Sequence, residues 1–219
     1  RKLQWQMDSV SKRLAVLLEA GRRDRINAMD ELRQGKKYGH WIWFVFPTLA
    51  ARGGDMFSAM QVNGAGADLR NEQEAAAYAV HPELRSNLVD AFNTLESAMA
   101  KHHSQAPWKV LDEEFGREAV GEWLNGPVDS FKVWASATLF ATLAYRKGDD
   151  ELRQAALNVL SHFKGDVIYS AGGKGTSGHV HGPASNQMYV LKGPDQETLR
   201  ILGETNWSAI AGDSTKNEL

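Results

Sequence analysis

Apolar residues recur at intervals of three and four along the first third of the chain, which is the spacing that places them on one side of an α-helix. One such stripe ends shortly before Gly21 and a second ends shortly before Gly35. Glycine commonly lies just after the last turn of a helix, so we predict two helices here, each closed by its glycine. The stripe residues are Leu3, Met7, Val10, Leu14, Leu17 and Leu18, then Ile26, Met29 and Leu32.

The segment after residue 70 contains two helix signals. Asn71 precedes Glu74 by three positions, which is the spacing of a capping box and predicts a helix over residues 72–80. His81 and Pro82 then interrupt this helix and begin another, because proline is tolerated in the first turn of a helix but not in its interior. The predicted buried face of that second helix consists of Leu84, Leu88, Phe92, Leu95 and Met99.

The segment of residues 129–147 is apolar on nearly all sides, so we expect it to be a helix in the middle of the molecule. Asp129 is a candidate for its N-terminal cap, and Asp149 or Asp150 and Asp195 are candidates for the caps of two later helices. The other predicted elements are short: helices near 110–115, 119–124 and 196–202, extended segments near 167–169 and 188–191, and a Gly- and Ala-rich loop over 52–68 that folds over a site.

These elements predict an all-α protein, a multi-helix globule packed around the central helix as a single domain over residues 1–219. The formal net charge of −2, with no basic half, argues against a partner of duplex nucleic acid. The longest mostly apolar stretch, residues 133–145, is too short for a helix that spans about 30 Å of hydrocarbon, so we expect no membrane partner. No signal peptide is visible, and we expect a cytoplasmic location.

The densest group of aromatic residues is the segment 40–47, HWIWFVFP, which follows the basic pair Lys36 and Lys37. One interpretation is a pocket in which a flat ligand stacks on Trp41 or Trp43 and contacts Phe46, while His40 exchanges a proton, since histidine titrates near neutral pH. The other interpretation is that these rings fill the core and that His40 caps a turn.

Two further groups are candidates for the same site. Asp129, Lys132 and Ser136 would share one face of the central helix, where polar groups are costly to bury unless they are bonded. The alternative is that Asp129 only caps the helix and Ser136 bonds to the preceding turn. Lys37, with Lys36 and Arg33, is placed to bind an anion, or these residues form a solvated helix end.

The chemistry of metals and cofactors has little support in the sequence. The chain has no cysteine, which removes thiolate metal sites and cysteine nucleophiles. His179 and His181 lie in a glycine-rich segment, residues 172–183, but two ligands are too few for a stable zinc site. The glycines of this segment lack the Gly-Lys-Ser/Thr ending of a phosphate-binding loop. We therefore expect no metal and no cofactor, and interpret the segment as a lid or surface loop.

Several separated segments resemble the bacterial domain-of-unknown-function family 1810, whose members are often mislabelled calpastatin. The resemblance covers roughly residues 27–203, with residues 172–183 as an insertion, and it implies a small, helical, cytosolic protein with a shared pocket and no established activity. The segments that carry it are ELRQGKK (31–37), HWIWFVFP (40–47), AAAYAVHPEL (75–84), DSFK (129–132), SATLF (136–140) and GPDQETL (193–199).

We therefore expect a ligand-binding protein, of the hydrolase or transferase class if it is an enzyme, which the sequence leaves open. A nucleotide- or ADP-ribose-like molecule suits a site that combines rings with basic groups, with His40, Lys132 and Ser136 as the candidates for catalysis. The alternative is a non-catalytic module that binds a protein partner through exposed rings, either those of Trp5, Trp108 or Trp123 or those of the aromatic segment 40–47.

Overall fold

The computed structural model describes residues 2–50, 61–62, 65–66, 68–101, 107–111, 128–170 and 187–212 of the 219-residue chain. Several sequence predictions lie outside the described residues: most of the loop over 52–68, residues 112–115 of the helix near 110–115, the helix over 119–124, the glycine-rich segment 172–183 with His179 and His181, and Trp123. The prediction of an all-α fold is confirmed, since helices make up most of the described chain.

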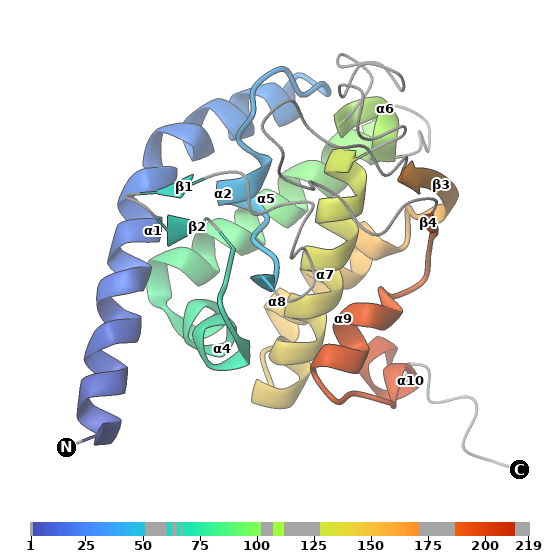
Figure 1. Ribbon diagram of the computed structural model, residues 1–219. Coiled ribbons are helices and arrows are strands. Elements are labelled where there is room, and N and C mark those ends of the chain that lie inside the picture. Colours follow the sequence, from blue (N-terminus) through green and yellow to red (C-terminus); the bar gives the residue numbers. More distant parts are fainter. Residues whose placement is uncertain are drawn as a thin grey trace, which may run out of the picture.

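The first helix, α1 (Lys2–Arg33), runs without interruption along one edge of the molecule (Figure 1). The prediction of two helices separated at Gly21 is therefore wrong. Gly21 is buried, and a Cβ atom at this position would lie 3.3 Å from the Cβ of Phe44, so the glycine allows a close approach of the next segment to α1. Gly35 follows the end of α1 with a φ of 83°, a left-handed conformation that glycine adopts without strain, and this predicted helix end is confirmed.

The two helices predicted after residue 70 are confirmed. In α4 (Glu72–Val80) the side chain of Asn71 accepts a hydrogen bond from the backbone N–H of Glu74 at 2.9 Å, and α5 (Pro82–Lys101) begins at the predicted proline. The carboxylate of Glu74 accepts from the N–H of Arg70 rather than that of Asn71, so only half of the capping box forms. All five residues of the predicted apolar face of α5 are buried.

The helix α7 (Val128–Lys147) lies in the centre of the molecule, as predicted, and every side chain from residue 130 to residue 144 is buried (Figure 1). It packs against α4, α8 (Asp150–Leu160) and α9 (Gln196–Ile201), among others. Because α7 includes Val128, Asp129 lies in its first turn, and the predicted cap at Asp129 is wrong. The caps of the next helices are confirmed: Asp149 accepts from the N–H of Leu152, and Asp195 from that of Glu197.

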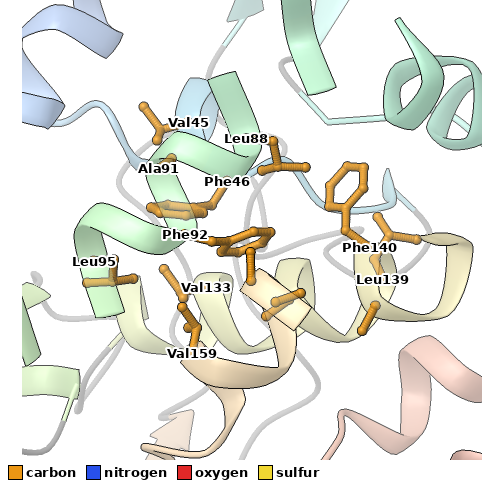
Figure 2. Packing of buried hydrophobic residues seen from close by; sticks show 14 of the residues in the cluster. Val45, Phe46, Leu88, Ala91, Phe92, Leu95, Val133, Leu139, Phe140 and Val159 are labelled. Carbon is orange, nitrogen blue, oxygen red and sulfur yellow. The ribbon is translucent and has the colours of Figure 1, made fainter. Parts of the chain in front are cut away.

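The core forms where α5, α7 and α8 meet the segment after α2 (Ile42–Val45). Figure 2 shows rings and branched side chains from these elements pointing toward one another, with Phe46 beside Phe92. The centroids of these two rings are 5.3 Å apart. The second half of the aromatic segment therefore fills the interior, as the core interpretation predicted, because Phe46 has no exposed surface.

The remaining elements are short. The two predicted extended segments are confirmed as one antiparallel pair. No helix among the described residues is long and apolar enough to cross a membrane. The short elements are α6 (Pro107–Leu111), α10 (Trp207–Ala211), the strands β3 (Lys164–Ser170) and β4 (Gln187–Lys192), and a two-residue pairing of β1 (Gln61–Val62) with β2 (Ala65–Gly66).

Candidate functional site

The turn between α1 and α2 separates the aromatic segment into surface and core. His40 is exposed, Trp41 is buried, and Trp43 is half-buried in the short helix α2. The two indoles therefore differ in their access to solvent, and only Trp43 lies between the surface and the interior. This arrangement combines the two interpretations of the segment, since one end packs in the core and the other borders solvent.

Lys37 is buried at the start of this turn, with 1% of its side chain exposed. Its Nζ lies 2.5 Å from Oδ2 of Asp129 on α7 and 5.3 Å from the centroid of the Trp41 ring. Its backbone N–H donates to the carbonyl of Val110 on α6 at 2.8 Å. The ammonium group is therefore held between a carboxylate and an indole face, while 17% of the Asp129 side chain remains exposed.

Lys132, one turn further along α7, is equally buried. Its Nζ donates to Oδ1 of Asp68 at 2.9 Å and to Oγ1 of Thr48 at 3.4 Å. The Thr48 hydroxyl in turn donates to Asp68 at 3.1 Å, so the three polar groups satisfy one another. The ammonium also lies 3.9 Å from the centroid of the Trp43 ring, within the range of a cation–π interaction.

The two ion pairs form one electrostatic unit, which we call the buried charge cluster: Lys37, Asp129, Lys132, Asp68 and Thr48. Burial lowers the pKa of Lys132, although Asp68 and then Asp129 oppose this shift. Burial likewise raises the pKa of Asp129, against the opposing charges of Lys37, Lys132 and His40. Asp129 thus lies in the field of both lysines and of the exposed imidazole, which connects the buried cluster to the surface.

The structure brings together five of the predicted site residues: Lys37, Trp41, Trp43, Asp129 and Lys132. Ser136 and Phe46 point elsewhere. The fully buried hydroxyl of Ser136 donates to the carbonyl of Pro47 at 2.8 Å, a different partner from the preceding turn of its own helix. A catalytic role for Ser136 stays a prediction, and the observed bond ties α7 to the segment after α2.

The other predicted cations lie at the surface. Lys36 lies with its Nζ 5.8 Å from the centroid of the Tyr38 ring, and Arg33 is exposed and paired with Asp30 at 3.1 Å. Arg33 therefore behaves as the solvated helix end of the alternative interpretation. Arg33 and Lys36 are close to Lys37 in the sequence, but of the three only Lys37 is buried.

Three polar residues at this site were not predicted from the sequence: Thr48 and Asp68 of the cluster, and Glu31, whose carboxylate accepts a hydrogen bond from the indole Nε1 of Trp41 at 2.6 Å. An isolated parallel bridge between Leu49 and Leu69 brings Thr48 and Asp68 together, with backbone bonds from Leu69 to Thr48 and from Ala50 to Leu69, each 2.8 Å long. A bridge of one residue has no periodic pattern in the sequence, so the contact between Thr48 and Asp68 could not be predicted from it. Asp68 is the last residue of the predicted loop over 52–68, most of which lies outside the described residues.

The described residues also form hollows away from the cluster. Two of about 280 and 340 Å³ lie between α1 and α5, and one of about 430 Å³ lies beside the junction of α7 and α8. Lining residues include Thr94 in the first, Asn87 in the second and Leu143 in the third. A pocket at Trp43 therefore stays a prediction.

Comparison with known proteins adds a family but no activity. The family model described as "Protein of unknown function (DUF1810)" matches residues 11–167. The match thus starts and stops earlier in the chain than the resemblance over residues 27–203. The crystal structure of a conserved hypothetical protein, Rv1873 from Mycobacterium tuberculosis, is 23% identical over 68% of this chain and 84% of that chain, with a TM-score of 0.45. No curated protein matches the sequence.

Proposed function

This chain belongs to the DUF1810 family of proteins of unknown function, so we propose a function from the geometry of the site alone. We propose that the protein binds a small molecule at the exposed edge of the buried charge cluster. The observation that carries the proposal is the burial of two lysine side chains, each close to an indole and paired with an aspartate, one of which, Asp129, also lies in the field of the exposed His40.

The energetic cost of this arrangement supports a functional role. Removing an ion pair from water costs several kcal/mol for each ion by order of magnitude, and packed apolar side chains of the same volume often stabilise a core as well or better. Lys132 occupies a helix whose neighbouring side chains are nearly all apolar, so an apolar residue would suit the fold there. Clusters of buried ionisable groups with shifted pKa values are a characteristic of functional sites.

The exposed edge of the cluster indicates the class of ligand. Tyr38 is 50% exposed, His40 is exposed and Trp43 is half-buried, so rings border the surface of the turn, and Lys36 adds a positive charge. Flat ligand rings stack on aromatic side chains with about 1–3 kcal/mol per base in nucleic-acid proteins. An aromatic ligand that carries a negative charge, such as a nucleotide or an ADP-ribose-like molecule, suits these groups.

The proposal includes hydrolase or transferase chemistry on the bound ligand. His40 is the group that donates or accepts the proton, because an imidazole carries both a donor and an acceptor nitrogen and this one faces solvent. Lys37 and Lys132 support the two indoles from the buried side, each neutralised by its aspartate, and Lys36 supplies the positive charge at the exposed edge. Ser136 serves as a buried brace through its bond to Pro47.

A thermal-shift and calorimetric titration with AMP, ADP, ADP-ribose and ribose 5-phosphate tests the proposal. A compound that binds the folded state raises its stability by RT ln(1 + [L]/Kd), so the midpoint rises with ligand concentration. We expect such a rise for the wild-type protein, and its loss in His40→Ala. The unliganded midpoint of His40→Ala should match that of the wild type, since the imidazole is exposed.

The matched control is His162→Ala, which removes a second imidazole that lies 3.8 Å from Glu96 on α5. This variant should respond to ligand like the wild type. Two results would count against the proposal: no compound of the panel raises the wild-type midpoint, or His40→Ala binds as tightly as the wild type.

The alternative of a protein-binding module rests on exposed tryptophans. Trp108 on α6 is half-buried, and the side chains of Trp5 and Trp123 lie outside the described part of the chain. The half-buried Trp43 at the cluster covers a charged group, since its ring lies 3.9 Å from the Lys132 ammonium. This observation favours the small ligand.

A further inference from the structure

We propose that Glu31 is the positioning residue of this site, because its carboxylate holds the turn that presents His40 and the indole of Trp41. The functional importance of this role rests on the proposed function, since the position of the imidazole matters for activity only if the site binds a ligand. The hydrogen bonds of Glu31 to the turn are present in the unliganded protein, and the first test is made on that form.

The carboxylate of Glu31 accepts hydrogen bonds from three donors of one turn. The backbone N–H groups of Tyr38 and Gly39 donate to Oε2 at 2.7 and 2.9 Å, and the indole Nε1 of Trp41 donates to the same oxygen at 2.6 Å. Oε1 receives a further bond from the N–H of Gly39 at 3.1 Å. Donors from residues on both sides of His40 therefore converge on one side chain of α1.

The glycine at position 39 allows this close approach. A Cβ atom there would lie 2.9 Å from Cδ1 of Trp41 and 3.1 Å from Oε1 of Glu31, both shorter than ordinary contacts. Any other residue at this position has to displace the indole or the carboxylate. Gly39 and Glu31 thus form one fitted unit.

The opposite end of the turn is fixed by α6 and α7. The backbone of Lys37 donates to Val110 at 2.8 Å, and its ammonium pairs with Asp129. The turn is therefore anchored at Lys37 by two helices and at residues 38–41 by Glu31, while His40 remains on the surface. Burial alone would raise the pKa of Glu31, but the bonds from Gly39, Tyr38 and Trp41 lower it below its ordinary value, so the acceptor stays charged at neutral pH.

Glu31→Gln is the direct test, because it keeps the shape of the side chain and removes its charge. The first measurement is NMR of the unliganded protein, with the Trp41 indole and His40 imidazole resonances assigned from the Trp41→Phe and His40→Ala variants. In the wild type we expect a downfield Trp41 indole N–H resonance that moves as Glu31 titrates in acid. In Glu31→Gln we expect the loss of this downfield position and of its pH dependence, and a shifted His40 resonance.

The second measurement is affinity for whichever compound of the panel binds the wild type. We expect Glu31→Gln to weaken binding by about tenfold, the equivalent of one hydrogen bond to a charged group. The matched control is Asp30→Asn, which removes a charge from the same turn of α1, where Asp30 pairs with Arg33 and is exposed. It should leave both resonances and the affinity unchanged.

Gly39→Ala provides a second variant that displaces the turn without changing any charge, and it should shift the same two resonances even if Glu31→Gln folds poorly. The proposal is overturned if Glu31→Gln leaves the Trp41 and His40 resonances in place, or if Asp30→Asn moves them equally. A wild type that binds no compound would refute the proposed function alone, since the unliganded spectra still decide the role of Glu31.

Discussion

The two lysines of the cluster have different environments, although both are paired with an aspartate near an indole. Lys132 and Asp68 are both buried, and Thr48 completes their hydrogen bonds. Lys37 is equally buried, but part of its partner Asp129 reaches solvent. The Lys132 pair therefore depends more strongly on mutual neutralisation, whereas Asp129 remains partly hydrated.

Removal of one partner of the inner pair should be costly. We expect Lys132→Met to reduce the free energy of unfolding by about 3–5 kcal/mol, because the carboxylate of Asp68 is left buried without a counter-charge. The double variant Lys132→Met/Asp68→Asn should lose less than the sum of the two single variants, since no uncompensated charge remains. Urea denaturation of the four proteins measures the coupling.

Lys147→Met is the matched control for this cycle, because Lys147 lies exposed at the end of the same helix. It should change the free energy of unfolding by no more than about 0.5 kcal/mol. Additive effects in the double variant would contradict the assignment of Lys132 and Asp68 as a coupled pair.

At the level of helices, the chain uses charged side chains to join elements that lie far apart in sequence. Arg85 on α5 donates to both carboxylate oxygens of Asp149, each at 2.7 Å, and Asp149 also caps α8 through the N–H of Leu152. A second contact, from Arg85 to Glu151 at 2.7 Å, lies more exposed. One aspartate thus begins α8 and connects it to α5.

This arrangement predicts a pH dependence. The hydrogen bond from Arg85 lowers the pKa of Asp149 below its ordinary value of 3.8, so the folded state favours the ionised carboxylate. The stabilisation is complete above the unfolded pKa and is lost as the pH falls through the lower folded value. We expect Asp149→Asn to be less stable than the wild type by about 1–2 kcal/mol at pH 7. The difference should shrink as the pH falls below 3.8.

Urea midpoints of both proteins across the acid range measure this dependence. Asp150→Asn is the control, since the Asp150 side chain is 84% exposed and pairs only one turn away with Arg153. A difference between wild type and Asp149→Asn that stays constant from pH 7 into acid would show that the charge of Asp149 is not the cause.

For the molecule as a whole, the central position of α7 implies that the described helices share one core. Side chains of α5, α7 and α8 meet there with Phe46 (Figure 2). A change at this junction should therefore affect the stability of all these helices together. If residues 1–219 form a single domain, as expected from the sequence, a change in this core should unfold the whole protein in one transition.

We expect Leu139→Ala to reduce the free energy of unfolding by about 2–5 kcal/mol, because Leu139 is fully buried and the lost side chain leaves a cavity. Far-UV circular dichroism and tryptophan fluorescence should report the same denaturation midpoint in the wild type and in the variant. Tyr145→Ala, at an exposed position of α7, is the control and should change stability little. Two separated transitions in the wild type would contradict a single domain.

The elements that sequence analysis predicted correctly depend on local signals. The apolar face of α5 follows from a repeat of three and four residues, and the caps Asn71, Asp149 and Asp195 act on N–H groups two or three residues away. The failure at Gly21 has the opposite cause. A glycine after an apolar stripe has the same appearance whether it ends a helix or lets another segment approach, and here the neighbour is Phe44.

The sequence identified only some residues of the candidate site, because the others are recognised only by contacts between segments far apart in the chain. Residue types alone singled out Lys37, the two indoles, Asp129 and Lys132, because rings and charges together are unusual in an apolar context. Which of these residues pair with one another depends on where α1, α7 and the bridge at Leu69 meet. The same long-range packing brings Glu31, Thr48 and Asp68 into contact with them. Helix periodicity and capping act over a few residues and can be recognised in a linear chain. The partner of a buried charge is chosen by long-range packing, which exists only once the helices have come together.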